Sequence, residues 1–165
     1  HAVAIKDTLS LEDAEGITLY YGQKQSAVDE MIETTRHERL WESAHENLEI
    51  LFTSSLFYED PTIVQLRVTA AVAPPHPSWK TPQGIQIGAE LSTVLTTLEK
   101  SNADLEGDVL DLLFAIDPTD PNQMYEITME EFYELPENTM IFRAIYRFQD
   151  GILEEIILGD LDSMS

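Results

Sequence analysis

The sequence contains no cysteine. Disulfide bonds, cysteine-ligated zinc and catalysis by a thiol are therefore excluded. At 165 residues the chain is long enough to bury a hydrophobic core without such cross-links. Long apolar runs are also missing, since none approaches the roughly 20 residues that a membrane-spanning helix needs. The chain begins at His1 rather than Met, and we expect a trimmed chain or a mature exported chain whose signal peptide or lipid-bearing cysteine lay upstream.

Basic residues are scarce. Nine Lys and Arg stand against 31 Asp and Glu, a formal net charge of −22. Residues 1–80 carry a net charge of −7 and residues 81–165 a net charge of −15. Nucleic acids and anionic lipid surfaces reward clustered positive charge, so both are disfavoured as partners. A basic partner protein, bound cations, or solubility alone remain compatible with this charge.

Catalytic and cofactor-binding motifs are missing as well. The sequence has no Gly-x-Ser-x-Gly, His-Glu-x-x-His, P-loop or Gly-x-Gly-x-x-Gly motif. Its four histidines, at positions 1, 37, 45 and 76, are scattered. We therefore predict no enzymatic activity and no cofactor. The rival hypothesis is a hydrolase that uses a pair of carboxylates. Because the chain has 31 acids, such a pair can be proposed almost anywhere in the sequence, so we name no residues for it.

Two acidic segments invite a metal-binding interpretation. If residues 36–46 are helical, Glu38, Glu42 and His45 share one face, although a solvated helix with charge pairs explains the same spacing. Asp117 and Asp120 also offer oxygen ligands. Their segment, however, lacks the glycine and the terminal glutamate of a calcium loop, so we interpret it as a proline-broken turn. We predict no metal site.

A strand-helix pattern occurs twice. The pattern Gly-Ile-x-Ile-Gly at 84–88 is followed by Leu91, Val94, Leu95 and Leu98, which form one apolar helix face. The segment 16–22 also begins and ends with glycine, and Val28, Met31 and Ile32 follow it at matching spacing. The sequence therefore predicts two copies of one unit, with 84–98 superimposing on 16–30.

The remaining periodicity divides the chain into predicted elements and units. We predict helices at 26–37, with Ser26 as N-cap, and at 90–100, and leave 36–46 open between helix and loop. Strands are predicted at 17–21, 48–52, 62–69, 84–88, 109–116, 127–135, 140–148 and 152–158. Asp150-Gly151 marks a hairpin between the last two. The predicted organisation is a polar leader with a frayed outer end (1–15), a first αβ unit (16–72), a Pro-rich linker (73–83), a second αβ unit (84–159) and a loose tail (160–165).

This pattern resembles a known family. The segments 80–88 and 146–152 are its best matches to the tandem αβ repeats of the β-lactamase-inhibitor-protein-like fold, which small outer-membrane lipoproteins of the SmpA/OmlA type also use. The resemblance covers about residues 16–159. It implies an α+β protein with a curved, mainly antiparallel sheet, two helices on one face, and the other face free to bind protein. The inhibitor proteins carry disulfides, which this chain lacks, and no inhibitory loop can be mapped onto it. The alternative class is an all-β sandwich with incidental helices.

Three of the nine basic residues are arginines inside predicted strands. Alternate residues of a strand point to the same face of the sheet. Gln65 therefore shares an outward face with Arg67, and Arg143 shares one with Arg147. We predict that these four residues share the free sheet face, with Trp79 or Tyr133 near its edge, as a positively charged binding surface. The alternative is that cross-strand acids such as Glu154 or Glu130 neutralise the arginines.

These observations lead to a functional hypothesis. We predict a non-enzymatic protein-binding module of an exported or envelope-associated bacterial protein, located in the periplasm, at the cell surface or outside the cell. An anchoring lipid upstream of His1 would fit the same hypothesis. A structural envelope lipoprotein domain without a discrete ligand, and a carboxylate-based hydrolase, are the alternatives.

Overall fold

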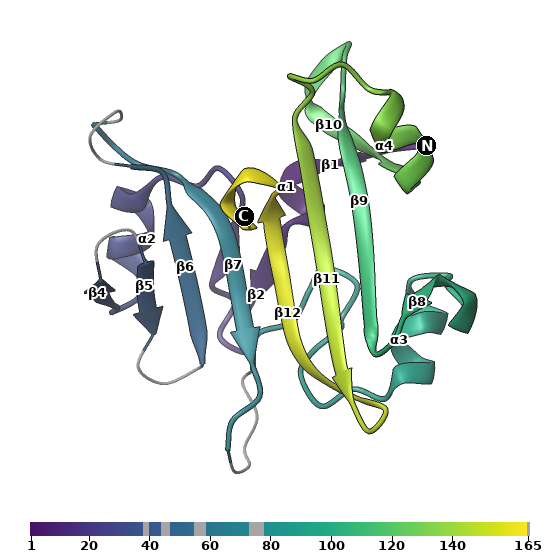
Figure 1. Ribbon diagram of the computed structural model, residues 1–165. Coiled ribbons are helices and arrows are strands. Elements are labelled where there is room, and N and C mark those ends of the chain that lie inside the picture. The colour runs from purple at the N-terminus through teal and green to yellow at the C-terminus, as the bar shows by residue number, and fades with distance from the viewer. Residues whose placement is uncertain (38–39, 44–46, 55–58, 73–77, 165) are drawn as a thin grey trace.

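A sheet of ten strands organises the structure (Figure 1). The computed structural model describes residues 1–37, 40–43, 47–54, 59–72 and 78–164. All strand pairings given for the sheet are antiparallel. Nine strands follow one another in the order β1 (Ala2–Ala4), β10 (Asp120–Ile127), β9 (Val109–Asp117), β11 (Ile141–Gln149), β12 (Ile152–Asp160), β7 (Ile63–Thr69), β6 (Leu48–Phe52), β5 (Leu40–Ser43) and β4 (Thr35–His37), and β8 (Leu105–Glu106) pairs with β9. A separate hairpin joins β2 (Ser10–Glu12) and β3 (Thr18–Tyr20).

The helices are short. They are α1 (Ile5–Thr8), α2 (Gln25–Met31), α3 (Leu91–Thr97), α4 (Met129–Glu134) and the 3₁₀ turns η1 (Asn102–Asp104) and η2 (Asp162–Met164). None of the helices in the described ranges has the length and hydrophobicity required to cross a membrane. Short helices together with a ten-stranded antiparallel sheet confirm the predicted α+β class with a mainly antiparallel sheet.

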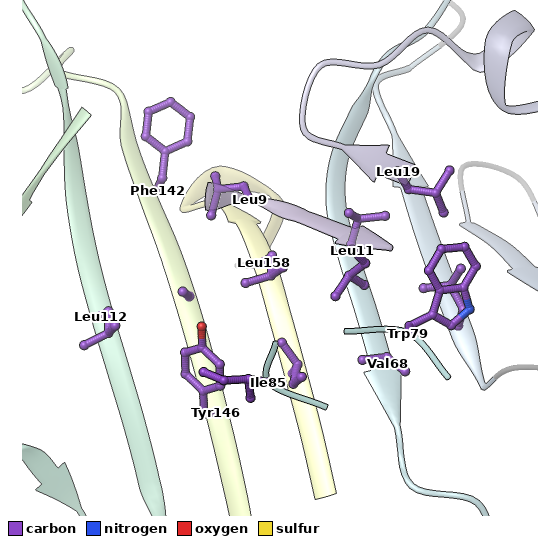
Figure 2. Close-up of a cluster of buried hydrophobic side chains, with 14 of the residues drawn as sticks. Leu9, Leu11, Leu19, Val68, Trp79, Ile85, Leu112, Phe142, Tyr146 and Leu158 are labelled. Atoms are coloured by element: carbon purple, nitrogen blue, oxygen red, sulfur yellow. The ribbon is translucent and has the colours of Figure 1, made fainter. Parts of the chain in front are cut away.

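One face of the sheet is buried under the main core. Alternate residues of β6, β7, β11 and β12 point into one large apolar cluster, to which α1, α2, α3 and the β2–β3 hairpin also contribute. Figure 2 shows Leu9, Leu11 and Trp79 lying over β7 and its neighbours in this cluster. The predicted helices therefore pack on one face, because Val28 of α2 and both Val94 and Leu95 of α3 belong to the same cluster.

The centre of the sheet is the pairing of β7 with β12, two strands that are far apart in the sequence. Arg67 lies opposite Ile157, and Gln65 lies opposite Gly159. A Cβ atom at Gly159 would lie 2.4 Å from the carbonyl oxygen of Val64, so only glycine fits there without a backbone shift. This pairing joins the strands on the β6 side to those on the β11 side.

The two glycine-bounded segments make matching backbone hydrogen bonds. Gly16 N donates to Asp13 O at 3.3 Å, and Gly84 N donates to Thr81 O at 2.8 Å. Further along, Gly22 N donates to Ile63 O of β7, and Gly88 N donates to Leu153 O of β12, both at 2.9 Å. All four glycines have φ between 86° and 94°, a conformation that favours glycine. Each segment is thus attached in the same way to one of the two central strands.

Several predicted strands are confirmed. β6, β7, β9, β11 and β12 form close to their predicted ranges, and β6 pairs antiparallel with β7 as expected. Asp150 and Gly151 take positive φ angles of 52° and 78° in the turn between β11 and β12. By contrast, 84–88 forms no extended strand, and within it only Gln86 makes an isolated bridge, to Lys80.

The helix predicted at 26–37 forms but is shorter than predicted, and its predicted N-cap is wrong. α2 has Lys24 as its N-cap rather than Ser26, and Ser26 instead donates from its hydroxyl to Asp60 at 2.7 Å. The helix ends at Met31 because Ile32 is extended, and the β-branched residues that follow favour strand β4. The described parts of 36–46 lie in strands β4 and β5 rather than in a helix, and Glu38 and His45 of the weighed metal site lie outside the described residues.

The strand predicted at 127–135 is also wrong, since this segment contains α4. Thr128 and Glu131 form a capping box, in which the Thr128 hydroxyl accepts from Glu131 N and the Glu131 carboxylate accepts from Thr128 N, each at 3.1 Å. α4 lies on the opposite sheet face from the main core, so not all helices occupy one face. Phe132 packs there against a second apolar cluster, which includes Leu113 and Ile127.

Both ends of the described chain are ordered, contrary to prediction. β1 pairs with β10, and Ile5, Leu9 and Leu11 are buried, so the frayed leader predicted at 1–15 is wrong. The tail predicted to be loose from residue 160 begins inside β12, and the Ser163 hydroxyl donates to Asp160 O at 2.8 Å. The proline-rich part of the predicted linker, 73–77, lies outside the described residues.

Candidate functional site

The face of the sheet opposite the main core carries most of the predicted binding residues. Because neighbouring strands are in register, Arg67, Ile157, Ile145 and Asp111 form one lateral row, and Gln65, Gly159 and Arg143 form the next. We call this surface the open face. α4 and Leu161 cover the end of this face near Leu113 and Ile141, whereas the side chains of Arg67 and Arg147 are 36% and 49% exposed. The prediction that Gln65, Arg67, Arg143 and Arg147 share a face is correct.

Four charged residues form a continuous chain across the strands of the open face. Arg67 Nη1 donates to Glu49 at 2.6 Å, and Arg67 Nε donates to Glu155 Oε2 at 2.7 Å. The other oxygen of Glu155 accepts from Arg147 Nε at 3.0 Å. We call Glu49, Arg67, Glu155 and Arg147 the charge network. It crosses β6, β7, β12 and β11, and so spans the central pairing of the sheet.

Glu155 is the least exposed member of the charge network. The whole residue is 8% exposed, and each of its carboxylate oxygens accepts from a different arginine. Burial works against the charge of Arg67, but the hydrogen bonds with Glu49 and Glu155 outweigh it and raise the pKa of the Arg67 guanidinium. The Arg67 guanidinium therefore keeps its charge at neutral pH, and the network sets two arginines against two glutamates.

The third arginine is paired separately. Arg143 forms an ion pair with Asp111 on β9, and its Nε lies 3.2 Å from Asp111 Oδ1. All three arginines of the open face are thus neutralised by Glu49, Glu155 and Asp111. The predicted positively charged island is therefore wrong. Neutralisation by cross-strand acids takes place, but through partners other than Glu154 and Glu130.

Apolar side chains lie between these charges. Ile145 is opposite Ile157 across the β11–β12 pairing, and it is only 8% exposed even though it lies on the open face. Arg143 and Arg147 flank Ile145 on the same strand face. A hollow of about 470 Å³ adjoins the charge network and is lined by Arg67, Thr69, Ala70, Arg147, Glu154 and Glu155. The surface thus combines ordered charge, apolar area and a concavity.

The two predicted edge residues have different positions. Trp79 is 1% exposed and belongs to the main core, so its prediction as a surface residue is wrong. A large aromatic ring beside a linker gains more by covering core residues than by facing water. Its Nε1 has no hydrogen-bond partner among the described residues. Tyr133 is 76% exposed on α4, whose neighbour Phe132 packs on the open-face side of the sheet.

The acidic turn at 117–122 satisfies its own oxygens. Asp117 Oδ1 accepts from Thr119 N at 2.9 Å and from the Thr119 hydroxyl at 2.7 Å, and these bonds lower the pKa of Asp117. Asp120 Oδ1 accepts from Asn122 N at 3.0 Å. Within the described ranges, no three His, Asp or Glu side chains are grouped as metal ligands.

Sequence reasoning missed Glu49, Asp111 and Glu155 as partners of the arginines. The alternation along each strand places these acids on the open face, but it does not say which strands are neighbours. That depends on β7 pairing with β12 and on β9 pairing with β11. Comparison with known proteins adds no further assignment, because no protein-family model, curated protein or solved structure matches the chain.

Proposed function

We propose that the protein is a non-enzymatic protein-binding module that uses the open face of its sheet. The observation that carries this proposal is the charge network, an ordered set of partly exposed arginines around Ile145 and Ile157. Arginine side chains that are already fixed by ion pairs lose less conformational freedom when a partner binds. Arg147 is the most accessible of them, and the planar guanidinium suits stacking and carboxylate recognition.

The architecture that we propose for this module is a tandem of two αβ units joined at the β7–β12 pairing. The matching hydrogen bonds of the two glycine-bounded segments support this arrangement, as do the hairpins β6–β7 and β11–β12. In the first hairpin the register shifts just before Phe52, and in the second it shifts just before Phe148. This organisation agrees with the resemblance to the β-lactamase-inhibitor-protein-like and SmpA/OmlA-type repeats. The proposed setting is an exported or envelope-associated bacterial protein.

A carboxylate-based hydrolase is the weaker proposal. The cavity beside α4 is lined by four acids, but three of them already have structural partners. Asp111 pairs with Arg143, Glu126 pairs with Lys100, and Asp104 caps η1 by accepting from Ser101 N at 2.8 Å. Acids used in this way are poor candidates for the paired acid and base of such an enzyme. A structural lipoprotein domain without a ligand would leave the open face unused.

Capture from envelope extracts of the source organism tests the proposed function. The wild-type protein, Arg147→Gln and the matched control Lys24→Gln, which changes an exposed cation next to α2, are immobilised, and bound proteins are quantified by mass spectrometry. We expect at least one protein that the wild type and Lys24→Gln capture and Arg147→Gln does not. The same protein should bind the purified wild type in calorimetry. If the wild type and both variants capture the same proteins, the proposal that the open face binds a partner is refuted.

A further inference from the structure

α4 presents an exposed apolar patch at the covered end of the open face. Met129 and Tyr133 are four positions apart, so they lie on the same side of the helix, and they are 50% and 76% exposed. Met140, in the segment after α4, is 42% exposed. We call Met129, Tyr133 and Met140 the α4 patch. Phe132 lies between this patch and the second apolar cluster: its ring contacts the Tyr133 ring edge-on, with ring centroids 5.3 Å apart, and its side chain packs against the cluster that contains Leu113 and Ile127.

Two cavities adjoin this helix, and Phe132 lines both of them. One cavity, of about 430 Å³, is lined by Met129, Phe132 and the ion pairs Arg143–Asp111 and Lys100–Glu126. The other, of about 500 Å³, is lined by Phe132, Tyr133 and Met140 together with Glu137 and Asp162. Exposed Met and Tyr beside concavities are the residue types that anchor partner side chains. The α4 patch is therefore built to receive apolar side chains in both cavities.

The charge around the α4 patch selects the kind of partner. From Asp120 to Phe142 the chain has six acids and no Lys or Arg. Glu130, Glu134 and Glu137 are exposed next to the patch. A second copy of this chain would place acid against acid, and an anionic membrane would be repelled in the same way. A segment that combines Lys or Arg with apolar side chains complements both the acids and the cavities.

We propose that the α4 patch binds a basic, amphipathic segment of a partner protein, whose apolar side chains enter the two cavities while its cations face the surrounding glutamates. This inference rests on the proposed protein-binding function and adds the chemistry of the partner. It also extends the binding surface from the charge network onto α4.

Methyl NMR of the full chain tests this inference. The chain has five methionines, which are Met31, Met124, Met129, Met140 and Met164. Met129 and Met140 report on the α4 patch, and Met31, which is 36% exposed on α2, is the internal control. The probe is a short peptide in which Lys alternates with Leu and Phe. Two matched peptides carry Glu in place of Lys, or Ser in place of Leu and Phe.

We expect saturable shifts at Met129 and Met140, none at Met31, and binding of the first peptide only. The double variant Met129→Ser/Tyr133→Ser should weaken binding at least about tenfold, and Met31→Ser should not. Both variants change exposed side chains, and their melting temperatures check that they fold. Equal shifts at Met31, binding that does not saturate, or equal binding of the Glu peptide would overturn the inference.

Isoleucine methyls separate this inference from the proposed function. Shifts confined to Ile145 and Ile157 would overturn the α4 patch as the site while leaving the open face as a binding surface. Conversely, a peptide that binds at Met129 and Met140, together with a captured partner that Arg147→Gln does not affect, would support the α4 patch and refute the role of the charge network.

Discussion

Replacing Glu155 by Gln is the most direct test of the charge network. The change keeps the shape of the side chain, but the amide offers only one oxygen where the carboxylate offers two. Its NH₂ group must then face Arg67 or Arg147, each of which is a donor. A hydrogen bond to a charged group contributes roughly 1.5 to 3 kcal/mol, and loss of one partner from a fully buried ion pair costs roughly 3 to 5 kcal/mol.

The expected cost is below that upper range because both arginines reach solvent. With side chains that are 36% and 49% exposed, they recover hydration when Glu155 is neutralised. We therefore expect Glu155→Gln to lower the free energy of unfolding by about 2 kcal/mol. For a chain of this length that corresponds to a fall in melting temperature of about 4 to 8 °C.

Urea unfolding followed by circular dichroism measures this cost, and Glu49→Gln is its control. Glu49 contacts only Arg67 in the charge network, and its side chain is 28% exposed, against 10% for that of Glu155. Its neutralisation should cost about 0.5 kcal/mol. If Glu155→Gln costs no more than Glu49→Gln, then the network is a set of solvated pairs. The argument that its arginines are held in place for binding would then fail.

Three further predictions concern the packing around the site. Gly159→Ala should lower the free energy of unfolding by about 3 kcal/mol in urea titrations, because its Cβ would meet the Val64 carbonyl oxygen at 2.4 Å. Burial raises the pKa of Tyr146 above its ordinary value of 10.0, so above about pH 10 the unfolded state loses this proton first and stability falls as pH rises. Tyr146→Phe should make that fall shallower in unfolding titrations at successive alkaline pH values. Phe132→Ala should destabilise the protein by about 2 kcal/mol in thermal melts, whereas Tyr133→Ala should change stability by less than about 0.5 kcal/mol.

Each of these predictions has an outcome that contradicts it. Gly107, at φ +61° with open space around its Cβ position, is the control for Gly159, and equal costs of the two Ala variants would remove the steric argument. A Tyr146→Phe variant with the same alkaline slope as wild type would mean that other groups cause the fall. If Phe132→Ala and Tyr133→Ala cost the same, the proposed orientation of α4 is wrong.

Local periodicity was enough to predict much of the sheet. The alternation in β7 and the Asp150-Gly151 turn depend on neighbouring residues alone, and both form as predicted. Errors arose where distant pairing decides the structure. Residues 2–4 have no strong pattern of their own, and they become a strand because β10 offers them an edge. α4 was not predicted although Thr128 and Glu131 form a capping-box pattern in the sequence, because its apolar residues also fit a strand.

The candidate site could be predicted to a similar extent. Alternation placed Gln65, Arg67, Arg143 and Arg147 on one face, since that requires only the geometry of each strand and the direction of the core. The charge of the face could not be deduced in the same way. Glu155 lies between Arg67 and Arg147 because β12 lies between β7 and β11, and this order is a property of the whole sheet. The prediction of Trp79 as a surface residue failed because its burial depends on which core residues the segment after the linker covers, and local sequence does not show this.

The distribution of charge bears on how a partner would approach. The charge network has two arginines and two glutamates, so it adds no net field at long range, whereas the acids around α4 contribute to the −22 of the chain. Long-range attraction would therefore bring a basic partner to α4 first, because rim charges govern encounter more than final affinity. The arginines at the centre of the open face would act only at contact, with their orientation already fixed by Glu49 and Glu155. In the binding event that we propose, α4 would set the rate of association and the charge network would set how long the complex lasts.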